Sequence, residues 1–195
     1  MSKTAYDALV FFADGFEEIE AIGAVDILRR GGMKVASVSV TGSREVKGAH
    51  GVTILTDEVI ADVVGTQPEW VVLPGGMPGA ANLFENASVA DMVAAQNERA
   101  AHIAAICAAP ALVLAQSGLL DGRHMTCYPG FEAYCGKAVV DGSRSVVDGH
   151  FVTANGPSSV TNMCYEILKI SKGRDAALKV LSDMLVDTEK SDYSL

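Results

Sequence analysis

The stretch that decides the fold reads Ile103-Ala104-Ala105-Ile106-Cys107-Ala108-Ala109-Pro110. A short apolar run leads directly into a cysteine, two alanines and a proline. Such a run is typical of a strand buried on both faces, and proline suits the first turn of a helix, where its missing N–H loses no hydrogen bond. The stretch therefore predicts a strand ending at Ile106, followed at once by a helix over Ala108–Ser117.

The same alternation of short apolar runs and helical spacing continues along most of the chain. We expect the other strands at Ala8–Phe12, Lys34–Val40, Trp70–Leu73 and Phe151–Ala154, with weaker candidates at Val52–Leu55, Thr126–Tyr128 and Ser145–Val147. The other helices are expected at Glu17–Arg30, Ser88–Arg99, Ser158–Lys172 and Asp175–Leu185.

Boundary residues agree with this pattern. Ser88 and Asp91 have nearly the spacing of a capping box, and Gly118 and Gly173 fall where helices should stop. The pattern predicts an α/β fold with a doubly wound, mostly parallel sheet and helices on both faces. We expect one domain over residues 1–195, with its core at about residues 8–185 and a frayed tail at residues 188–195.

The composition of the chain excludes several classes of function. The 195 residues carry 15 Lys and Arg against 24 Asp and Glu, a formal charge of −9, which argues against nucleic-acid or anionic-membrane partners. Hydrophobic residues make up 49% of the chain, which excludes disorder for most of it. No signal peptide or membrane span is expected. The four cysteines lack C-x-x-C and zinc spacing, which favours reduced thiols in a cytoplasmic protein.

Cys107 is the first candidate for chemistry. It occupies a strand–turn–helix junction, the geometry of a nucleophile elbow, and a helix N-terminus should favour its thiolate. The alternative is an inert buried thiol. Cys127, Cys135 and Cys164 lack this setting, and we expect them to be structural.

Glu20 is the second candidate. In a helix it shares one apolar or small face with Phe16, Gly23, Ala24, Ile27 and Gly31. A carboxyl buried there should have a raised pKa, and its protonated form could donate a hydrogen bond to a thiolate or transfer a proton. The alternative is a glutamate at the edge of that face which reaches water.

Gly75 and Gly76 follow a strand, so their N–H groups could hold an oxyanion, although a plain tight turn explains the pair as well. His50, His102, His124 and His150 have no metal-ligand spacing. We therefore predict no metal site.

Together these motifs resemble the ThiJ/PfpI superfamily, in particular the branch named for the parkinsonism-associated protein deglycase. The resemblance runs from about Ala8 to Leu185. It is carried by five segments in consistent order, at residues 15–20, 25–32, 71–76, 104–110 and 155–157.

The resemblance implies a flavodoxin-like sandwich of the class I glutamine amidotransferase type that forms homodimers. It implies a reactive, oxidisable Cys107 with protonated Glu20 beside it, and an oxyanion site formed by the Gly75–Gly76 turn and Ala108. The pocket residues would be Glu17, His50, Tyr128, Asn155 and Gly156, with Asp26 and Arg30 on the dimer side. The implied activity is cofactor-free glyoxalase or deglycase chemistry on small aldehydes or glycated substrates.

The chain departs from the family pattern at some of these positions. Protease-like relatives have histidine where Ala108 stands, which argues against a protease. Tyr128 replaces a histidine of some relatives and cannot act as a neutral base near pH 7, while His50 and Asn155 replace pocket arginines. Two other readings therefore stay open: a redox-responsive or chaperone-like stress protein whose Cys107 is oxidised to sulfinate, and an inactive binding module that keeps the fold for dimerisation.

Overall fold

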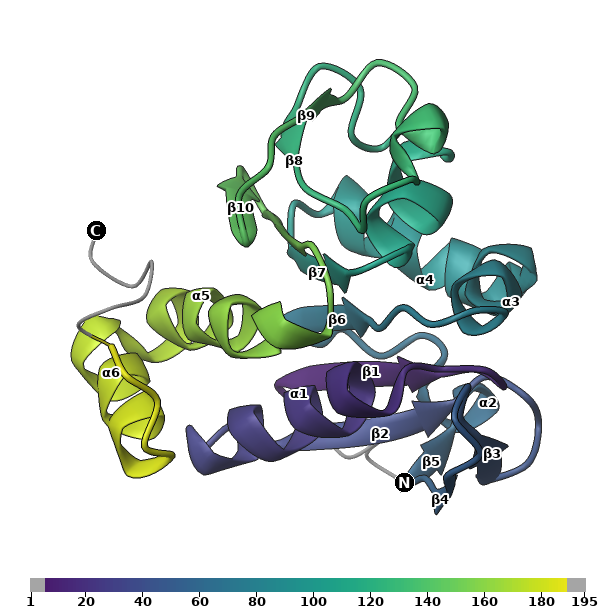
Figure 1. Cartoon of the computed structure of the whole chain (residues 1–195). Coiled ribbons are helices and arrows are strands. Elements are labelled where there is room, and N and C mark those ends of the chain that lie inside the picture. The colour runs from purple at the N-terminus through teal and green to yellow at the C-terminus, as the bar shows by residue number, and fades with distance from the viewer. Residues whose placement is uncertain (1–5, 189–195) are drawn as a thin grey trace.

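The computed structural model describes residues 6–188. Its centre is a seven-stranded sheet in the order β10-β11-β7-β6-β1-β2-β5 (Figure 1). The strands are β1 (Ala8–Phe12), β2 (Val35–Ser39), β5 (Glu58–Val59), β6 (Trp70–Leu73), β7 (His102–Ile106), β10 (Ser145–Asp148) and β11 (Phe151–Ala154). All neighbours pair in parallel except β10, which is antiparallel to β11. The predicted α/β class and mostly parallel sheet are confirmed.

Helices cover both faces of this sheet, as Figure 1 shows. Helices α1 (Glu18–Arg30) and α5 (Val160–Lys172) pack against each other on one face, and α6 (Arg174–Asp183) packs on α5. On the opposite face lie α3 (Gly79–Glu85), α4 (Ala87–Glu98) and a π-helical turn, η1 (Pro110–Ala115). A short α2 (Ile60–Val63) follows β5.

Two small sheets lie outside the central one. Strands β3 (Glu45–Lys47) and β4 (Thr53–Leu55) form an antiparallel pair, and β8 (His124–Met125) pairs in parallel with β9 (Val139–Val140). Between β8 and β9 the chain forms a short 3-10 helix, η2 (Glu132–Tyr134), and a second one, η3 (Pro157–Ser159), precedes α5.

Three expected elements need correction. The helix expected at Ser88 begins at Ala87, because the side chain of Asn86 caps it by accepting a hydrogen bond from the Val89 N–H (3.1 Å). The strand expected at Thr126–Tyr128 is wrong, because β8 ends at Met125. The Thr126 N–H donates to the side chain of Thr153 instead of to the backbone of a neighbouring strand. The helix expected over Ala108–Ser117 is the π-helical turn η1.

The remaining expected elements agree to within a few residues, and β3, β5, α2 and α3 were not predicted. The tail expected at residues 188–195 lies, apart from Thr188, outside the described residues.

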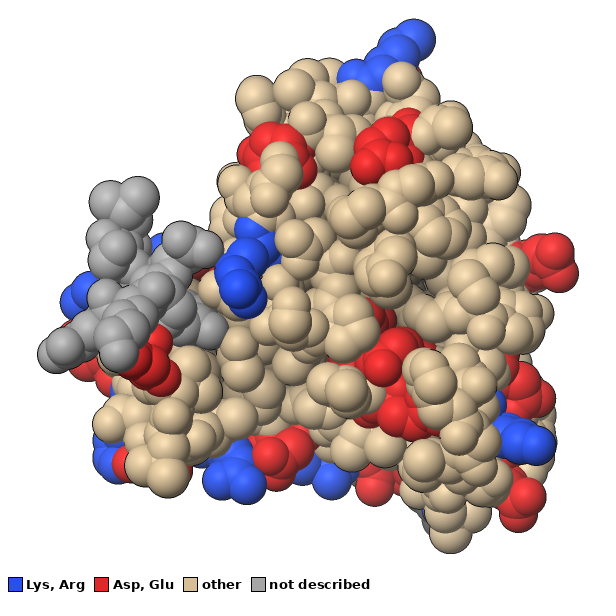
Figure 2. All heavy atoms as spheres, viewed as in Figure 1, with Lys and Arg blue, Asp and Glu red and all other residues tan. Residues whose placement is uncertain are grey.

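The surface carries the acidic balance of the composition. In Figure 2 the Lys and Arg side chains are scattered, and no continuous basic band crosses the described part of this face. None of the helices that the structure describes is long and apolar enough to cross a lipid bilayer.

Candidate active site

The carboxyl ends of β1, β6, β7 and β11 meet at one edge of the sheet, because these four strands are neighbours and parallel. Hydrogen bonds join the loops that follow them. The Cys107 N–H donates to the Ala154 carbonyl (2.9 Å), and the Glu17 N–H donates to the Gly75 carbonyl (3.0 Å). This edge is where ligand sites form in doubly wound folds.

Cys107 directly follows β7 and has a φ of 65°, in the left-handed region that residues other than glycine rarely adopt. Its side chain is almost fully buried. The sulfur accepts hydrogen bonds from the N–H groups of Gly76 and Ala108, which favour the thiolate. A backbone held in this conformation at a strand–helix junction is a frequent feature of functional sites.

Glu20 lies on the buried face of α1 and is fully inaccessible to solvent. The prediction of one carboxyl on an apolar face is confirmed, and the alternative of a side chain that reaches water is wrong. Oε2 accepts a hydrogen bond from the Gly75 N–H (2.8 Å), whereas Oε1 is buried without a conventional donor among the described residues. Burial and, to a smaller extent, the charge of Glu17 raise the pKa of Glu20 to about 7, against the effect of the hydrogen bond from the Gly75 N–H.

Gly75 brings the two side chains together. A Cβ built at this position would lie 2.6 Å from the Cys107 Cβ and 2.8 Å from Glu20 Oε2, so only glycine fits between them. Its N–H was expected to serve an oxyanion, but it donates to Glu20 instead. That assignment is therefore corrected, and Gly76 and Ala108 are the backbone donors that face the sulfur.

The thiol and the carboxyl titrate as a pair. Burial and the charge of Glu20 together raise the pKa of Cys107 to about 12, against the effect of the two N–H groups. The helix N-terminus was expected to favour the thiolate; its N–H groups do lower the pKa, but the effect of burial is larger. Since Glu20 ionises near pH 7 and the second proton leaves only far above it, the pair holds one proton between its two groups in mildly alkaline solution.

Tyr128, one of the expected pocket residues, lies beside the cysteine, and Gly156 lies against Tyr128. Tyr128 donates its N–H to the Cys107 carbonyl (2.8 Å) and is half-exposed. A Cβ at Gly156 would lie 3.2 Å from the Tyr128 ring, so these residues touch. The Asn155 side chain instead accepts a hydrogen bond from the Ser159 hydroxyl (2.7 Å), which secures the start of α5.

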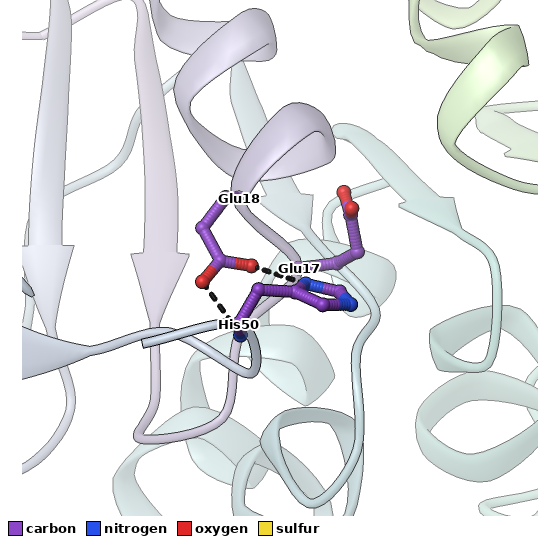
Figure 3. A group of neighbouring side chains, drawn as sticks. All are labelled: Glu17, Glu18 and His50. Atoms are coloured by element: carbon purple, nitrogen blue, oxygen red, sulfur yellow. Dashed lines mark hydrogen bonds and ion pairs between the residues drawn. The ribbon is translucent and has the colours of Figure 1, made fainter. Parts of the chain in front are cut away.

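The other two expected pocket residues lie at the start of α1. Glu17 caps the helix, with Oε2 accepting the Glu20 N–H (2.8 Å). His50 is exposed and donates its backbone N–H (2.7 Å) to Glu18, whose second oxygen lies 2.8 Å from the His50 Nδ1 (Figure 3). This contact raises the pKa of His50. The role of Glu18 was not predicted, because its partner is distant in the sequence.

Glu17, Glu18 and His50 have ligand atoms within 4.8 Å of one another, a spacing compatible with a metal ion. Both Glu18 oxygens already accept hydrogen bonds, and Glu17 caps the helix, so a cation would have to displace these bonds. We assign this trio to holding the β3–β4 loop against α1.

Asp26 and Arg30, the residues expected on the dimer side, form an ion pair one turn apart on α1 (2.7 Å). Both side chains are about half exposed, on the side of the helix that faces solvent in this chain.

A doubly wound sheet with a cysteine at a strand–helix turn, beside a buried carboxyl from the first helix, defines a class of α/β proteins with a nucleophile-elbow thiol. Comparison with protein families makes the assignment specific. The chain belongs to the DJ-1/PfpI family, whose model matches residues 6–170.

Individual relatives agree with this assignment. The chain is 37% identical to protein dj-1beta of Drosophila melanogaster, covering 95% of this chain and 98% of the relative. It is 33% identical to protein DJ-1 homolog B of Arabidopsis thaliana over 98% of this chain, but spans only 44% of that relative's length. The structure of oxidized Toxoplasma gondii DJ-1 superimposes with a TM-score of 0.90 at 33% identity, covering 94% of this chain and 100% of the other.

Proposed function

We propose that this protein is a cysteine-dependent stress-protection protein that acts on reactive aldehydes, as a cofactor-free glyoxalase or deglycase. Membership of the DJ-1 family supports a stress-related function. The observation that carries the finer proposal is the packing of the Cys107 sulfur between two backbone N–H donors and the buried carboxyl of Glu20.

The reaction needs only these groups. The Glu20 carboxylate takes the proton of the Cys107 thiol as the sulfur attacks the aldehyde carbon of methylglyoxal. A C–S bond forms, the π bond of the carbonyl breaks, and the new alkoxide takes the proton back from Glu20. The Glu20 carboxylate then removes the proton of that carbon and returns it to the neighbouring carbon. The hydroxyl proton of the adduct passes to the neighbouring oxygen, which completes the conversion into a thioester of lactate. Water cleaves the C–S bond, releases lactate and restores the thiol.

The shared proton suits this sequence. Near its pKa of about 7, Glu20 can both donate and accept a proton at neutral pH, and its burial excludes competing water. Gly76 and Ala108 stabilise negative charge on the sulfur, and they are the nearest donors for an oxyanion formed beside it.

Lactate production from methylglyoxal tests this proposal. We expect Cys107→Ala and Glu20→Gln to abolish production, and Cys164→Ala, which alters a fully buried cysteine of α5, to retain it. Lactate formation by Cys107→Ala at the parent rate would refute the mechanism.

The second candidate is a redox sensor in which Cys107 is oxidised to sulfinate without turnover. Glu20 Oε1, buried without a conventional partner, favours it, because a protonated carboxyl could donate a hydrogen bond to a sulfinate oxygen. Intact mass after mild peroxide should show two added oxygens at Cys107, and Glu20→Gln should change the yield. Oxidation spread evenly over all four cysteines would argue against this candidate.

A homodimer is part of the same proposal, with the exposed face of α1 that carries Asp26 and Arg30 at the interface. Sedimentation of the purified chain over a range of concentrations tests it. A single monomeric species at every concentration would exclude the dimer.

A further inference from the structure

Two cysteines outside the candidate active site face each other. The sulfur atoms of Cys127 and Cys135 are 3.8 Å apart, and both side chains are almost fully buried. Both were expected to be merely structural. They flank the loop of residues 128–134, which includes η2 and joins the β8 side of the molecule to the edge of the sheet that carries Cys107.

The thiols are arranged for a bond between them. A disulfide needs the sulfurs about 2.0 Å apart, so each would move by about 0.9 Å, within reach of side-chain rotation. The Cys135 thiol also lies 3.7 Å from the Phe131 carbonyl and can donate to it, which leaves its sulfur free to accept from Cys127. The pair closes a loop, residues 128–134, whose residues are exposed or half-buried, so a small local opening of this loop exposes the thiols.

The geometry points to a second redox site, in which Cys127 and Cys135 close a reversible disulfide when a hydroperoxide oxidises the protein. This inference does not depend on Cys107, so it can be tested independently of the proposed function. The oxidant is a small hydroperoxide. The product is a disulfide that closes the loop next to the candidate active site into a ring.

The chemistry balances with hydrogen peroxide as the oxidant. One thiolate attacks peroxide, an S–O bond forms, the O–O bond breaks and water leaves, giving a sulfenic acid. The second thiol attacks that sulfur, the S–S bond forms, the S–O bond breaks and a second water leaves. Two thiols lose two protons and two electrons, and one peroxide becomes two waters.

Cys135 is the better candidate for the first step. Burial raises the pKa of both thiols, but the hydrogen bond from Cys127 lowers the pKa of Cys135, whereas it raises that of Cys127. The thiolate therefore forms more readily on Cys135.

The disulfide would act on the candidate active site through Tyr128. This residue directly follows Cys127, donates its N–H to the Cys107 carbonyl (2.8 Å), and packs its ring against Gly156 and Phe131. We expect movement of the Cys127 side chain toward Cys135 to shift Tyr128, because the two residues are neighbours in the chain. We expect closure of the ring to change the rate at which iodoacetamide alkylates Cys107.

Peptide mapping tests the inference directly. The folded, fully reduced protein is treated with one equivalent of hydrogen peroxide, free thiols are blocked with N-ethylmaleimide, and the protein is digested with trypsin. Cleavage after Arg123 and Lys137 yields a single peptide, residues 124–137, which contains both cysteines and no other. We expect it to be unlabelled and lighter by two hydrogens, and to regain two labels after reduction by dithiothreitol.

Four variants separate this site from the proposed function. Cys127→Ser and Cys135→Ser should each leave the peptide without a disulfide, whereas Cys107→Ser and Cys164→Ser should retain it. A Cys107→Ser protein that loses the disulfide would assign the oxidation to Cys107 and overturn an independent second site. Sulfinate on separate cysteines, with no disulfide peptide from the folded parent, would also overturn it.

Phenylarsine oxide gives a second measurement that needs no substitution in the parent. It binds two thiols at this separation, so we expect the reduced parent to bind one equivalent through Cys127 and Cys135, and to be protected from peroxide closure. No binding by the folded parent would contradict the paired arrangement. Binding that persists in Cys127→Ser or Cys135→Ser would do the same.

Discussion

Replacing Glu20 by glutamine should change how the stability of this protein depends on pH. Burial raises the pKa of Glu20 from 4.5 to about 7 in the folded chain, while the unfolded chain keeps the ordinary value. Between these pH values the folded state holds a proton that the unfolded state has lost, so the free energy of unfolding falls as the pH rises. The difference in pKa corresponds to about 3 kcal/mol.

Glutamine keeps the shape of the side chain and the acceptor for the Gly75 N–H, but it carries no charge at any pH. We therefore expect Glu20→Gln to gain about 3 kcal/mol over the parent between about pH 4 and about pH 8. Urea unfolding of the reduced proteins across this range measures the difference. Other acids with altered pKa, such as Asp57 and Asp148, contribute equally to both proteins and cancel.

Two controls sharpen this test. Glu85→Gln changes an exposed glutamate at the end of α3 and should leave the pH profile parallel to that of the parent. Repeating the comparison with Cys107→Ser in both proteins removes the titrating thiol that shares the proton. Parallel stability curves for Glu20→Gln and the parent over the whole range would show that the carboxyl is not held protonated by burial, and the proton transfer proposed for it would fail with it.

Two further predictions follow from the contacts. Gly75→Ala places a methyl group 2.6 Å from the Cys107 Cβ, so we expect the free energy of unfolding to fall by about 1–3 kcal/mol. The pH profile of Cys107 alkylation should change as well, and an unchanged profile would contradict the close packing. Arg30→Ala breaks a half-exposed ion pair with Asp26, which costs a single chain no more than about 0.5 kcal/mol. A clear weakening of self-association in sedimentation would then report the proposed dimer, and an unchanged association constant would exclude Arg30 from its interface.

The sequence predicts the centre of this fold well because local patterns determine it. Trp70–Leu73 and Phe151–Ala154 were placed at their observed bounds, since both are short apolar runs between turn residues. Once four such strands are parallel, their carboxyl ends share one edge, which brings Cys107 near the start of α1. The spacing of Glu20 on an apolar face then predicts its burial, which the structure confirms.

Contacts between distant segments are what the sequence could not provide. Gly75 was expected to offer its N–H to an oxyanion, but that N–H serves Glu20, and no local pattern reveals which acceptor a turn will meet. The thiolate of Cys107 was expected from its position at a helix start. The cost of burying its charge, which raises its pKa to about 12, depends on every element packed around it.

The chain between β8 and β9 holds another contact that the sequence did not predict. The sequence predicted only a weak strand there, at Thr126–Tyr128, and Cys127 and Cys135 were expected to be structural because neither lies at a strand–helix junction. Their apposition is set by η2, which folds the loop back so that residues eight positions apart meet at 3.8 Å. Because the same loop carries Tyr128 to the Cys107 carbonyl, any reaction that joins the two thiols acts on a wall of the candidate active site. A buried cysteine pair is thus better understood from the loop that it closes than from the reactivity of either sulfur alone.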